Sequence, residues 1–406
     1  MSDHRALRIL LLTYISPTEP FGAGQRTQLL TEALSSHGPV DVLFLRLGQP
    51  GGRHGAVTIT ASPTGREIEL CIARRGLSSL PRFDVPSSYV TRAVRRCVDL
   101  DSYDLIVSRY VKPALKLRLP ASVPLVVDFD DAVFAPPWSV LTTAKMRAGA
   151  ILRLLNDRVI ARCRLRYQAR PLARFLFCRS SEMAEYAWLR GEVLPNVPRL
   201  PPHRDPPNFH QDGPPTLLFI GLMDYLPNEE AVVWFLENAW PQVTHRVGEA
   251  RLVIAGKGSL ELLKRLPNIH HVDALGVVPS LAVVYARATA AIVPMRSGGG
   301  SNIKALEPYY FGRMTIATPR VRAAHGDVLR DGKDILTAND GRTFAEHCIR
   351  VLEDPAQAEV IAESGYQRIR CHLNETVFRQ TVDRTVHSLM NDREREGVST
   401  GRRSVA

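Results

Sequence analysis

The stretch P-M-R-S-G-G-G-S-N-I-K-A-L-E-P, residues 294–308, joins an apolar strand pattern to a helical pattern through three consecutive glycines. Glycines let an anion approach the backbone, and the free amides at a helix N-terminus attract negative charge. We therefore predict a helix from about Ser301 that binds phosphate, with Lys304 adding positive charge and Glu307 accepting hydrogen bonds from hydroxyls. Phosphate beside a diol is typical of a nucleotide. The competing interpretation is a flexible loop with a solvated Lys/Glu pair.

Outward from this stretch, short apolar runs alternate with amphipathic helical patterns along the whole chain. Runs rich in Val, Ile and Leu that do not alternate with polar residues are typical of parallel strands buried on both faces. The chain is therefore predicted to be an α/β protein. In its first part we expect a helix at Gln25–Ser36 and strands at Arg8–Tyr14, Val40–Leu45, Leu105–Ser108 and Pro124–Asp128.

Eight prolines in Leu194–Pro215 interrupt this rhythm and predict a linker without regular structure. After it we expect strands at Leu217–Gly221, Arg251–Ala255, near Val272, Ala291–Pro294 and Thr315–Ala317, and helices at Asn228–Trp240, Leu260–Arg265, Leu281–Arg287, Phe344–Glu353, Ala356–Cys371 and Val377–Asp392. The expected organisation is a first domain over 1–195, a linker over 196–215, a second domain over 216–375, a helix over 376–392 returning to the first domain, and a disordered tail over 393–406.

The bulk composition is that of a globular protein of 406 residues with a formal net charge of +11. Such a surface attracts anions, which nucleic acid, anionic lipid and phosphorylated substrates all supply. The six cysteines form no C-x-x-C pair, which argues against structural zinc and a disulfide framework and favours a reducing cytosol. The apolar run Ile9–Leu12 is too short for a signal peptide, and no stretch approaches the ~20 apolar residues that span a bilayer.

A strongly basic stretch, residues 145–174, holds nine Lys and Arg residues and one acid, Asp157. Interspersed Leu, Val and Ile residues give it an amphipathic pattern. It indicates either peripheral contact with an anionic membrane, at its inner face, or a solvated surface of the first domain, and the two interpretations are equally supported. Aromatic residues do not alternate with the arginines, so nucleic-acid binding is not expected.

A resemblance to a known family rests on several collinear motifs. S-G-G-G-S-N-I-K-A-L-E-P-Y-Y-F-G-R-M-T-I-A-T resembles the sugar-nucleotide-binding segment of family 4 retaining glycosyltransferases. The matches L-L-F-I-G-L-M-D-Y-L-P-N, L-V-I-A-G-K-G, V-P-S-L-A-V-V-Y-A-R-A-T-A-A-I-V-P and P-N-V-P lie in the family's order. The resemblance is strong over 194–355 and weaker over 7–135, and between these segments it amounts to little beyond the fold.

The resemblance implies a GT-B fold, in which two Rossmann-like domains face each other across a cleft. It also implies retention at the anomeric carbon and neither metal nor cofactor, the donor substrate being a nucleotide-diphosphate sugar. Glu307 would then hold the ribose hydroxyls, and Lys304 with the amides around Gly300 and Ser301 would face the diphosphate. The full set of donor-binding residues expected is Gly221, Lys257, Ser297, Gly299, Gly300, Ser301, Asn302, Lys304 and Glu307.

Three positions depart from the family pattern. A first glutamate, usual eight positions before the second, is replaced by Gly299, and the usual arginine and lysine after the first strand of the second domain are replaced by Leu222 and Pro227. Lys304, Lys257 and Arg296 are candidate substitutes for the diphosphate clamp. Backbone groups, Ser297, Ser301 or Asn302 would contact the sugar.

In the first domain, Gly22 and Gly24 precede the helix predicted from Gln25. A dinucleotide fingerprint is not supported, since Thr27 takes the third glycine's place and no acidic residue follows the second strand. The resemblance implies instead a loop near the donor phosphate and the acceptor. The alternative is a loop that only connects the first strand to the first helix and has no binding role.

An acidic cluster, Asp128, Asp130 and Asp131, follows the strand predicted at Pro124–Asp128. Carboxylates at this strand end would bind hydroxyls or take the acceptor proton as general base. The alternative is a capping aspartate with solvated neighbours. Arg109 and Tyr110 are expected beside the cluster, whereas His325 is expected in a surface loop.

The function predicted is a retaining, metal-independent glycosyltransferase that moves a hexose-type sugar to an acceptor hydroxyl on a glycan, a lipid carrier or a natural product. The alternatives are a nucleotide-sugar epimerase of the same architecture, a non-catalytic homologue that binds nucleotide or a partner, and a nicotinamide-dependent dehydrogenase. The sequence leaves the donor base, the sugar, the acceptor and the oligomeric state open.

Overall fold

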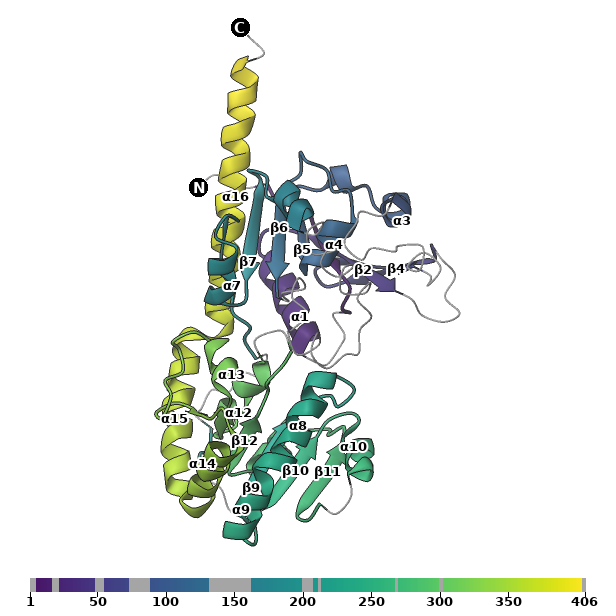
Figure 1. The fold of residues 1–406 in the computed structure, drawn as a ribbon. Coiled ribbons are helices and arrows are strands. Elements are labelled where there is room, and N and C mark those ends of the chain that lie inside the picture. The colour runs from purple at the N-terminus through teal and green to yellow at the C-terminus, as the bar shows by residue number, and fades with distance from the viewer. Residues whose placement is uncertain are drawn as a thin grey trace. The chain divides into compact units, whose positions relative to one another are not determined.

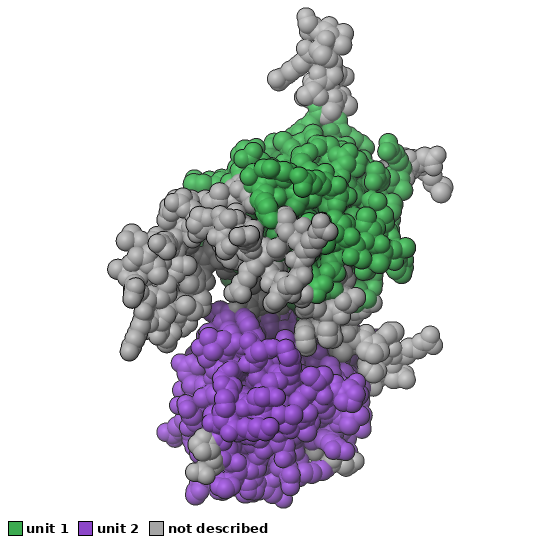
Figure 2. All heavy atoms as spheres, turned by 90° about the vertical axis from the view of Figure 1, so that its right-hand side faces the viewer, with its two compact units in different colours: residues 1–195, 375–406 green, residues 196–374 purple. Residues whose placement is uncertain are grey.

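A computed structural model describes residues 5–16, 22–47, 55–72, 88–130, 162–198, 207–210, 213–266, 269–298 and 302–403. Its chain divides into two compact units, Met1–Pro195 with Glu375–Ala406 as unit 1, and Asn196–Asn374 as unit 2. Figure 2 shows the two units in different colours. The chain thus leaves unit 1 once, builds unit 2 and returns.

The sheet of unit 1 has eight strands in the order β3-β4-β2-β1-β5-β6-β7-β8. All neighbouring strands are parallel except β3 and β4, which form an antiparallel hairpin at one edge. Every residue of β1, β5 and β6 is buried, as expected for parallel strands covered on both faces. The strands are Ile9–Thr13 (β1), Val40–Leu47 (β2), Val57–Ser62 (β3), Gly65–Ile72 (β4), Leu105–Arg109 (β5), Leu125–Phe129 (β6), Ala173–Phe177 (β7) and Gly191–Val193 (β8).

The helices of unit 1 come from both ends of the chain. Within the described residues they include Gly22–Ser35 (α1), Ser88–Cys97 (α3), Val111–Lys116 (α4), a helix over 162–168, Ser180–Glu185 (α7) and Glu375–Arg403 (α16), with a 3-10 turn at Leu100–Ser102 (η1). The long helix α16 packs against α1, β7 and β8 (Figure 1). Ion pairs join Arg379 to Glu32 at 2.9 Å and Arg384 to Glu192 at 3.1 Å.

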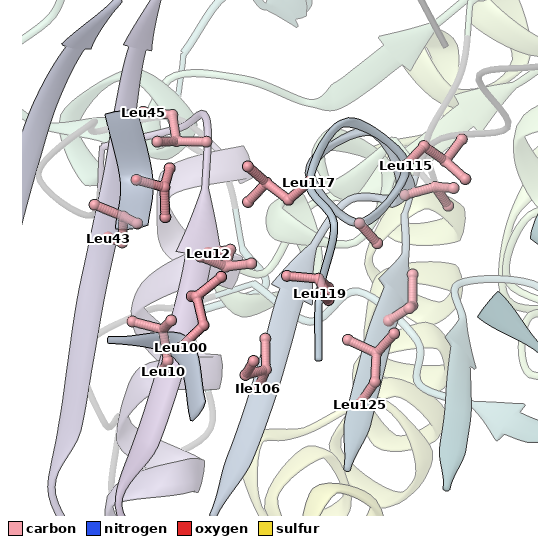
Figure 3. Packing of buried hydrophobic residues seen from close by; sticks show 14 of the residues in the cluster. Leu10, Leu12, Leu43, Leu45, Leu100, Ile106, Leu115, Leu117, Leu119 and Leu125 are labelled. Carbon is pink, nitrogen blue, oxygen red and sulfur yellow. The ribbon is translucent and has the colours of Figure 1, made fainter. Parts of the chain in front are cut away.

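A core cluster of unit 1 lies on one face of the sheet, and leucine is its most frequent residue. Alternate residues of neighbouring strands meet the end of α4 and the segment that follows it (Figure 3). Burying one such side chain contributes about 1.5–3 kcal/mol, so this layer is a main source of stability. The labelled residues of the layer are Leu10, Leu12, Leu43, Leu45, Leu100, Ile106, Leu115, Leu117, Leu119 and Leu125.

Unit 2 has a six-stranded parallel sheet in the order β11-β10-β9-β12-β13-β14. Its strands are Thr216–Ile220 (β9), Arg251–Ala255 (β10), Val272–Gly276 (β11), Ala290–Val293 (β12), Met314–Ala317 (β13) and Leu336–Thr337 (β14). Its helices are Leu226–Asn238 (α8), Trp240–Arg246 (α9), Ser259–Arg265 (α10), Leu281–Ala286 (α11), Glu307–Tyr310 (α12), Pro319–Ala323 (α13), Gly341–Glu353 (α14) and Pro355–His372 (α15), with a 3-10 turn at Ile303–Ala305 (η2).

A buried arginine attaches the start of unit 2 to its sheet. Arg313 donates from Nη1 to the carbonyls of Asn208 and Phe209 at 3.1 and 3.0 Å, and from Nε to the carbonyl of Tyr285 at 3.0 Å. The described parts of the predicted linker, 194–198, 207–210 and 213–215, contain neither helix nor strand. Its other residues lie outside the described ranges.

The α/β class predicted from the apolar runs is confirmed, and the strand at Arg251–Ala255 has its predicted bounds. Two predictions are wrong. The tail over 393–406 was expected to be disordered, but α16 continues to Arg403. The helix expected from Ser301 is replaced by η2 and the four residues of α12.

Candidate functional site

In unit 2, the first two parallel strands end in tightly packed turns. Gly256, after β10, has φ 124°, and a Cβ there would lie 2.0 Å from the carbonyl oxygen of Gly221, after β9. Only glycine permits both the conformation and this approach of two backbones. The predicted donor-binding residue Gly221 is thus part of the turn that leads into α8.

Lys304 lies close to this turn. Its Nζ donates a hydrogen bond to Oδ1 of Asn228, whose Nδ2 donates to the carbonyl of Leu222 at 2.8 Å. The ammonium group also lies 5.2 Å from the centre of the Phe219 ring. Burial lowers the pKa of Lys304 to about 7, although the charge of Glu307 acts in the opposite direction. The cation is therefore held beside the end of β9 with little charge compensation.

Glu307 is buried at the start of α12, with 8% of its surface exposed. Its Oε1 accepts a hydrogen bond from the Tyr285 hydroxyl at 2.8 Å. Burial raises the pKa of Glu307, while the Tyr285 hydrogen bond and the charge of Lys304 lower it less. The Tyr285 ring stacks on Phe311 at 4.7 Å, which fixes the hydroxyl that orients the carboxylate.

The beginning of the glycine-rich loop is attached to α8. Ser297 Oγ donates to Glu230 Oε2 at 2.7 Å, and the Arg296 guanidinium lies 5.0 Å from the centre of the Trp234 ring. Gly298 has φ 96°, and its carbonyl accepts from Arg320 Nη2 at 2.6 Å. Ser297 and Arg296 thus already have protein partners. Gly299, Gly300 and Ser301 lie outside the described residues.

The backbone after the loop corrects the predicted phosphate-binding helix. Asn302 has φ 52°, a left-handed conformation, and it precedes the 3-10 turn η2. Pro308 has no N–H to donate to the carbonyl of Lys304, so it is tolerated only in the first turn of a helix. Helix α12 therefore begins only at Glu307, so Lys304 precedes this helix and does not lie one turn inside it.

Lys257, a predicted substitute for the diphosphate clamp, lies on the surface. Its Nζ is 2.8 Å from Asp224 Oδ2, and 65% of its side chain is exposed. The hydrogen bond that Lys257 donates to Asp224 raises the pKa of Lys257. Of the three substitutes considered, Lys304 is the one held near both Gly221 and Glu307.

In unit 1, the carboxylates at the end of β6 belong to a buried ion-pair network. Arg26 Nη2 lies 2.6 Å from Asp128 Oδ1, and Arg109 Nη1 lies 3.0 Å from Asp128 Oδ2. Arg109 Nη2 lies 2.5 Å from Asp130 Oδ2, and Cys178 Sγ donates to Asp130 Oδ1 at 2.8 Å. The prediction that Arg109 lies beside the acidic cluster is confirmed.

The burial of Asp128 does not favour its predicted catalytic role. Asp128 is fully buried, whereas Asp130 is 7% exposed. Burial alone would raise the pKa of Asp130, but the charges of Arg109 and Arg26 outweigh it and hold the pKa below its usual range. Asp130 is thus a carboxylate that stays ionised. Asp131 lies outside the described residues, and the role of the cluster stays a prediction.

Arg26 is the residue of this network that sequence reasoning missed. It lies on α1, and its guanidinium also donates to the carbonyls of Leu194 and Pro195 at 3.1 and 3.2 Å. The Phe378 ring of α16 lies 5.4 Å from the guanidinium carbon. Arg26 thus contacts both segments by which the chain leaves and re-enters unit 1. The sequence around Arg26 does not indicate that it pairs with Asp128, which lies 102 positions further along the chain.

Three further positions of unit 1 and unit 2 differ from expectation. Gly22 and Gly24 lie in the first turn of α1, which begins before the predicted Gln25, so the predicted loop does not include them. His325 is 5% exposed and does not lie in a surface loop. Tyr110, by contrast, lies beside the acidic cluster as predicted, since its backbone N–H donates to the carbonyl of Asp128 at 3.0 Å; its φ of 71° is uncommon for this residue type.

Comparison with known proteins agrees with the arrangement in unit 2. Residues 214–354 match the family model described as Glycosyl transferases group 1. Unit 2 carries a group 1 glycosyltransferase domain. A curated relative, an uncharacterized 44.6 kDa protein in the cps region of Klebsiella pneumoniae, is 26% identical over 163 residues, which make up 38% of this chain and 41% of the relative.

Solved structures resemble the whole chain in fold. The sucrose-phosphate synthase of Thermosynechococcus elongatus matches with a TM-score of 0.66 at 17% identity, over 95% of this chain and 99% of that one. Anabaena HepE, in complex with UDP and glucose, matches with a TM-score of 0.60 at 13% identity, over 94% of this chain and 100% of that one. The group 1 glycosyltransferase domain thus belongs to a chain with the GT-B fold.

The described residues contain no cluster of three or more His, Cys, Asp or Glu side chains arranged to hold a metal ion. Among them, no helix combines the length and the apolar character that crossing a bilayer requires.

Proposed function

We propose that this chain is a retaining glycosyltransferase that transfers a hexose-type sugar from a nucleotide-diphosphate sugar to an acceptor hydroxyl, without a metal ion. The observation that carries the proposal is that Lys304, bonded to Asn228 next to Gly221, and the buried carboxylate of Glu307 lie near enough to act on each other electrostatically in a group 1 glycosyltransferase domain. The carboxyl ends of parallel strands are where open α/β sheets bind ligands.

In this proposal unit 2 binds the donor. Glu307, oriented by Tyr285, accepts hydrogen bonds from the ribose hydroxyls. Lys304 faces the diphosphate and stabilises the charge that develops on it as the bond to the sugar breaks. Gly299, Gly300, Ser301 and Asn302 are proposed to surround the phosphates and the sugar.

Unit 1 is proposed to bind the acceptor. Asp130, an ionised carboxylate with 7% of its surface exposed at the end of β6, would orient the acceptor hydroxyl by accepting its hydrogen bond; its lowered pKa does not favour the role of general base. Arg109 holds this carboxylate, so its role is to position Asp130.

The test has two stages. Calorimetry of the full chain against UDP-, GDP- and dTDP-sugars should reveal one preferred base. Free nucleotide diphosphate should then be released in the presence of an acceptor and an excess of chelator. Absence of binding to every nucleotide sugar would refute the donor assignment, and loss of turnover on chelation would refute metal independence. Inversion of the anomeric configuration in the product would refute retention.

A non-catalytic homologue that binds nucleotide is the second candidate. It is favoured by Leu222, Pro227 and Gly299, which replace the arginine, lysine and glutamate expected from the family. In the structure, Asn228 and Lys304 lie next to the position of the missing clamp. Donor binding without turnover across a broad acceptor panel would favour this candidate over the transferase.

A further inference from the structure

A short helix over residues 162–168 presents arginine and tyrosine on the surface of unit 1. Its inward side is fixed by Leu165 and by Gln168, whose Nε2 donates to the carbonyl of Ala114 at 3.0 Å. Arg162 and Arg166 are exposed and lie on the same side of the helix, because they are four residues apart. Tyr167 is 66% exposed, an unusual value for a large aromatic side chain.

Trp188, between α7 and β8, extends this surface. It is 39% exposed, and its ring centre lies 5.6 Å from the guanidinium carbon of Arg166. Within the helix over residues 162–168, the Arg164 guanidinium lies 4.9 Å from the centre of the Tyr167 ring. Arg118, which precedes β6, acts electrostatically on Arg164 and therefore lies near it. We call these residues the arginine–aromatic surface: Arg118, Arg162, Arg164, Arg166, Tyr167 and Trp188.

The charge of this surface is not compensated. Within the described ranges, none of its four arginines forms an ion pair with a carboxylate. Nε of Arg164 is buried without a hydrogen-bond partner. Burial lowers the pKa of Arg164; Tyr167 opposes this shift, and the neighbouring charge of Arg118 adds to it. An anion next to the exposed guanidinium groups of this surface would relieve the repulsion between them.

The combination of residue types indicates the kind of anion. Tryptophan and tyrosine rings are enriched at the level of lipid headgroups, and arginines keep their charge at the same depth while their stems cover apolar surface. Anionic lipid attracts basic residues to the membrane surface. We propose that the arginine–aromatic surface binds the anionic face of a lipid bilayer. This proposal does not depend on the transferase activity.

The full chain should co-sediment with vesicles of two parts phosphatidylcholine to one part phosphatidylglycerol, but not with vesicles of phosphatidylcholine alone. The double variant Arg162→Gln/Arg166→Gln should bind about 30-fold more weakly, because each basic residue near the surface contributes about a factor of five. Tyr167→Ala/Trp188→Ala should also weaken binding and should reduce the blue shift of tryptophan fluorescence that vesicles induce.

The matched control is Arg92→Gln/Arg96→Gln on α3, which removes the same charge from two other exposed arginines of unit 1. It should bind like the wild type, and Arg162→Lys/Arg166→Lys should retain most of the binding. Thermal unfolding of each variant excludes loss of the fold as the cause.

Three results would overturn the proposal. If the wild-type protein does not co-sediment with the anionic vesicles, it has no such membrane-binding surface. An equal loss in the α3 control would mean that only net charge matters. The third result combines two observations: heparin displaces the protein from the vesicles, and the Tyr167→Ala/Trp188→Ala variant binds the vesicles as the wild type does. Together they would show that the surface binds soluble polyanions instead of a bilayer.

Discussion

Lys304 holds its ammonium group next to an amide, a thioether and an aromatic ring, since Asn228, Met295 and Phe219 are its neighbours. Glu307 supplies the opposing charge. Such an environment disfavours the protonated form in the free protein, and a bound diphosphate would restore it. Binding at this position is therefore expected to depend on pH.

The first prediction concerns this dependence. Lys304 loses its proton near pH 7 in the free protein, against an ordinary pKa of 10.5. A diphosphate raises that pKa, so binding takes up a proton above pH 7, and affinity falls by up to about tenfold for each pH unit. Calorimetry with the preferred nucleotide diphosphate from pH 7.5 to about 9.5 would measure this.

The matched variant for this prediction is Lys304→Gln, which keeps the hydrogen bond to Asn228 without a titratable group. It should bind more weakly than the wild type at pH 7.5 and with a nearly constant affinity over the same range, about 7.5–9.5. An unchanged slope in the variant would assign the dependence to another group.

The second prediction tests the ribose assignment. Glu307→Ala is expected to weaken nucleotide affinity by about 1–3 kcal/mol, because buried hydroxyls then lose their acceptor. Tyr285→Phe removes only the hydroxyl that orients the carboxylate and should weaken affinity less. If nucleotide binding is unchanged in Glu307→Ala, the ribose lies elsewhere.

Most strands of the two sheets were predictable, because continuous apolar runs indicate buried parallel strands whatever surrounds them. Strands β4, β7, β8 and β14 were not predicted, and neither were three other kinds of feature. The left-handed Asn302 and Pro308 shortened a helix whose side-chain pattern looked regular. The hairpin of β3 and β4 has an exposed outer strand, V-T-I-T-A-S, without an apolar run. Arg26 pairs with a residue on a distant strand.

The third prediction concerns how Arg26 joins α1 to β6. Arg26→Met leaves a fully buried carboxylate with one partner fewer and is expected to reduce the free energy of unfolding by about 3–5 kcal/mol. Asp128→Asn in the same chain should recover part of this loss, since the uncompensated charge is removed. Urea denaturation would measure both.

A suitable comparison is Arg66→Met, which breaks the pair with Asp41 at 2.6 Å, where 48% of the arginine side chain is exposed. Its cost is expected to be about 1 kcal/mol, in the range of surface pairs. Equal costs at the two arginines would show that burial of the Arg26 pair does not matter.

The fourth prediction concerns the paired turns after β9 and β10. Gly256→Ala places a Cβ against the carbonyl of Gly221 at a positive φ and should cost about 3 kcal/mol or more. Gly332→Ala is the control, since Gly332 also has a positive φ, 75°, but nothing lies within 4 Å of the added atom. Its cost should be near 1 kcal/mol. Thermal unfolding of both variants would distinguish the cost of the steric contact at Gly256 from the cost of a positive φ alone.

At the scale of the whole molecule, the stability of unit 1 depends on the return of the last helix, α16. Phe378, Val382, Val386 and Leu389 of α16 are almost completely buried. Each contributes about 1.5–3 kcal/mol, a total comparable with the stability of a domain. The fifth prediction is that a chain ending at Asn374 keeps unit 2 folded and loses the cooperative unfolding of unit 1.

A chain ending at Glu396 is the control for this truncation, since it keeps all four apolar side chains. It should unfold as the full chain does. Limited proteolysis would show whether cleavage after truncation at Asn374 is confined to residues before Pro195. A protease-resistant unit 1 in the shorter chain would show that α16 is dispensable.

The interrupted path of the chain also determines the order in which its parts are completed on the ribosome. A growing polypeptide emerges from its N-terminus, so every strand of unit 2 is synthesised before the helix that covers α1, β7 and β8. Until then, those apolar residues of the nascent chain remain exposed to water and to chaperones. Unit 1 is therefore begun before unit 2 and completed after it.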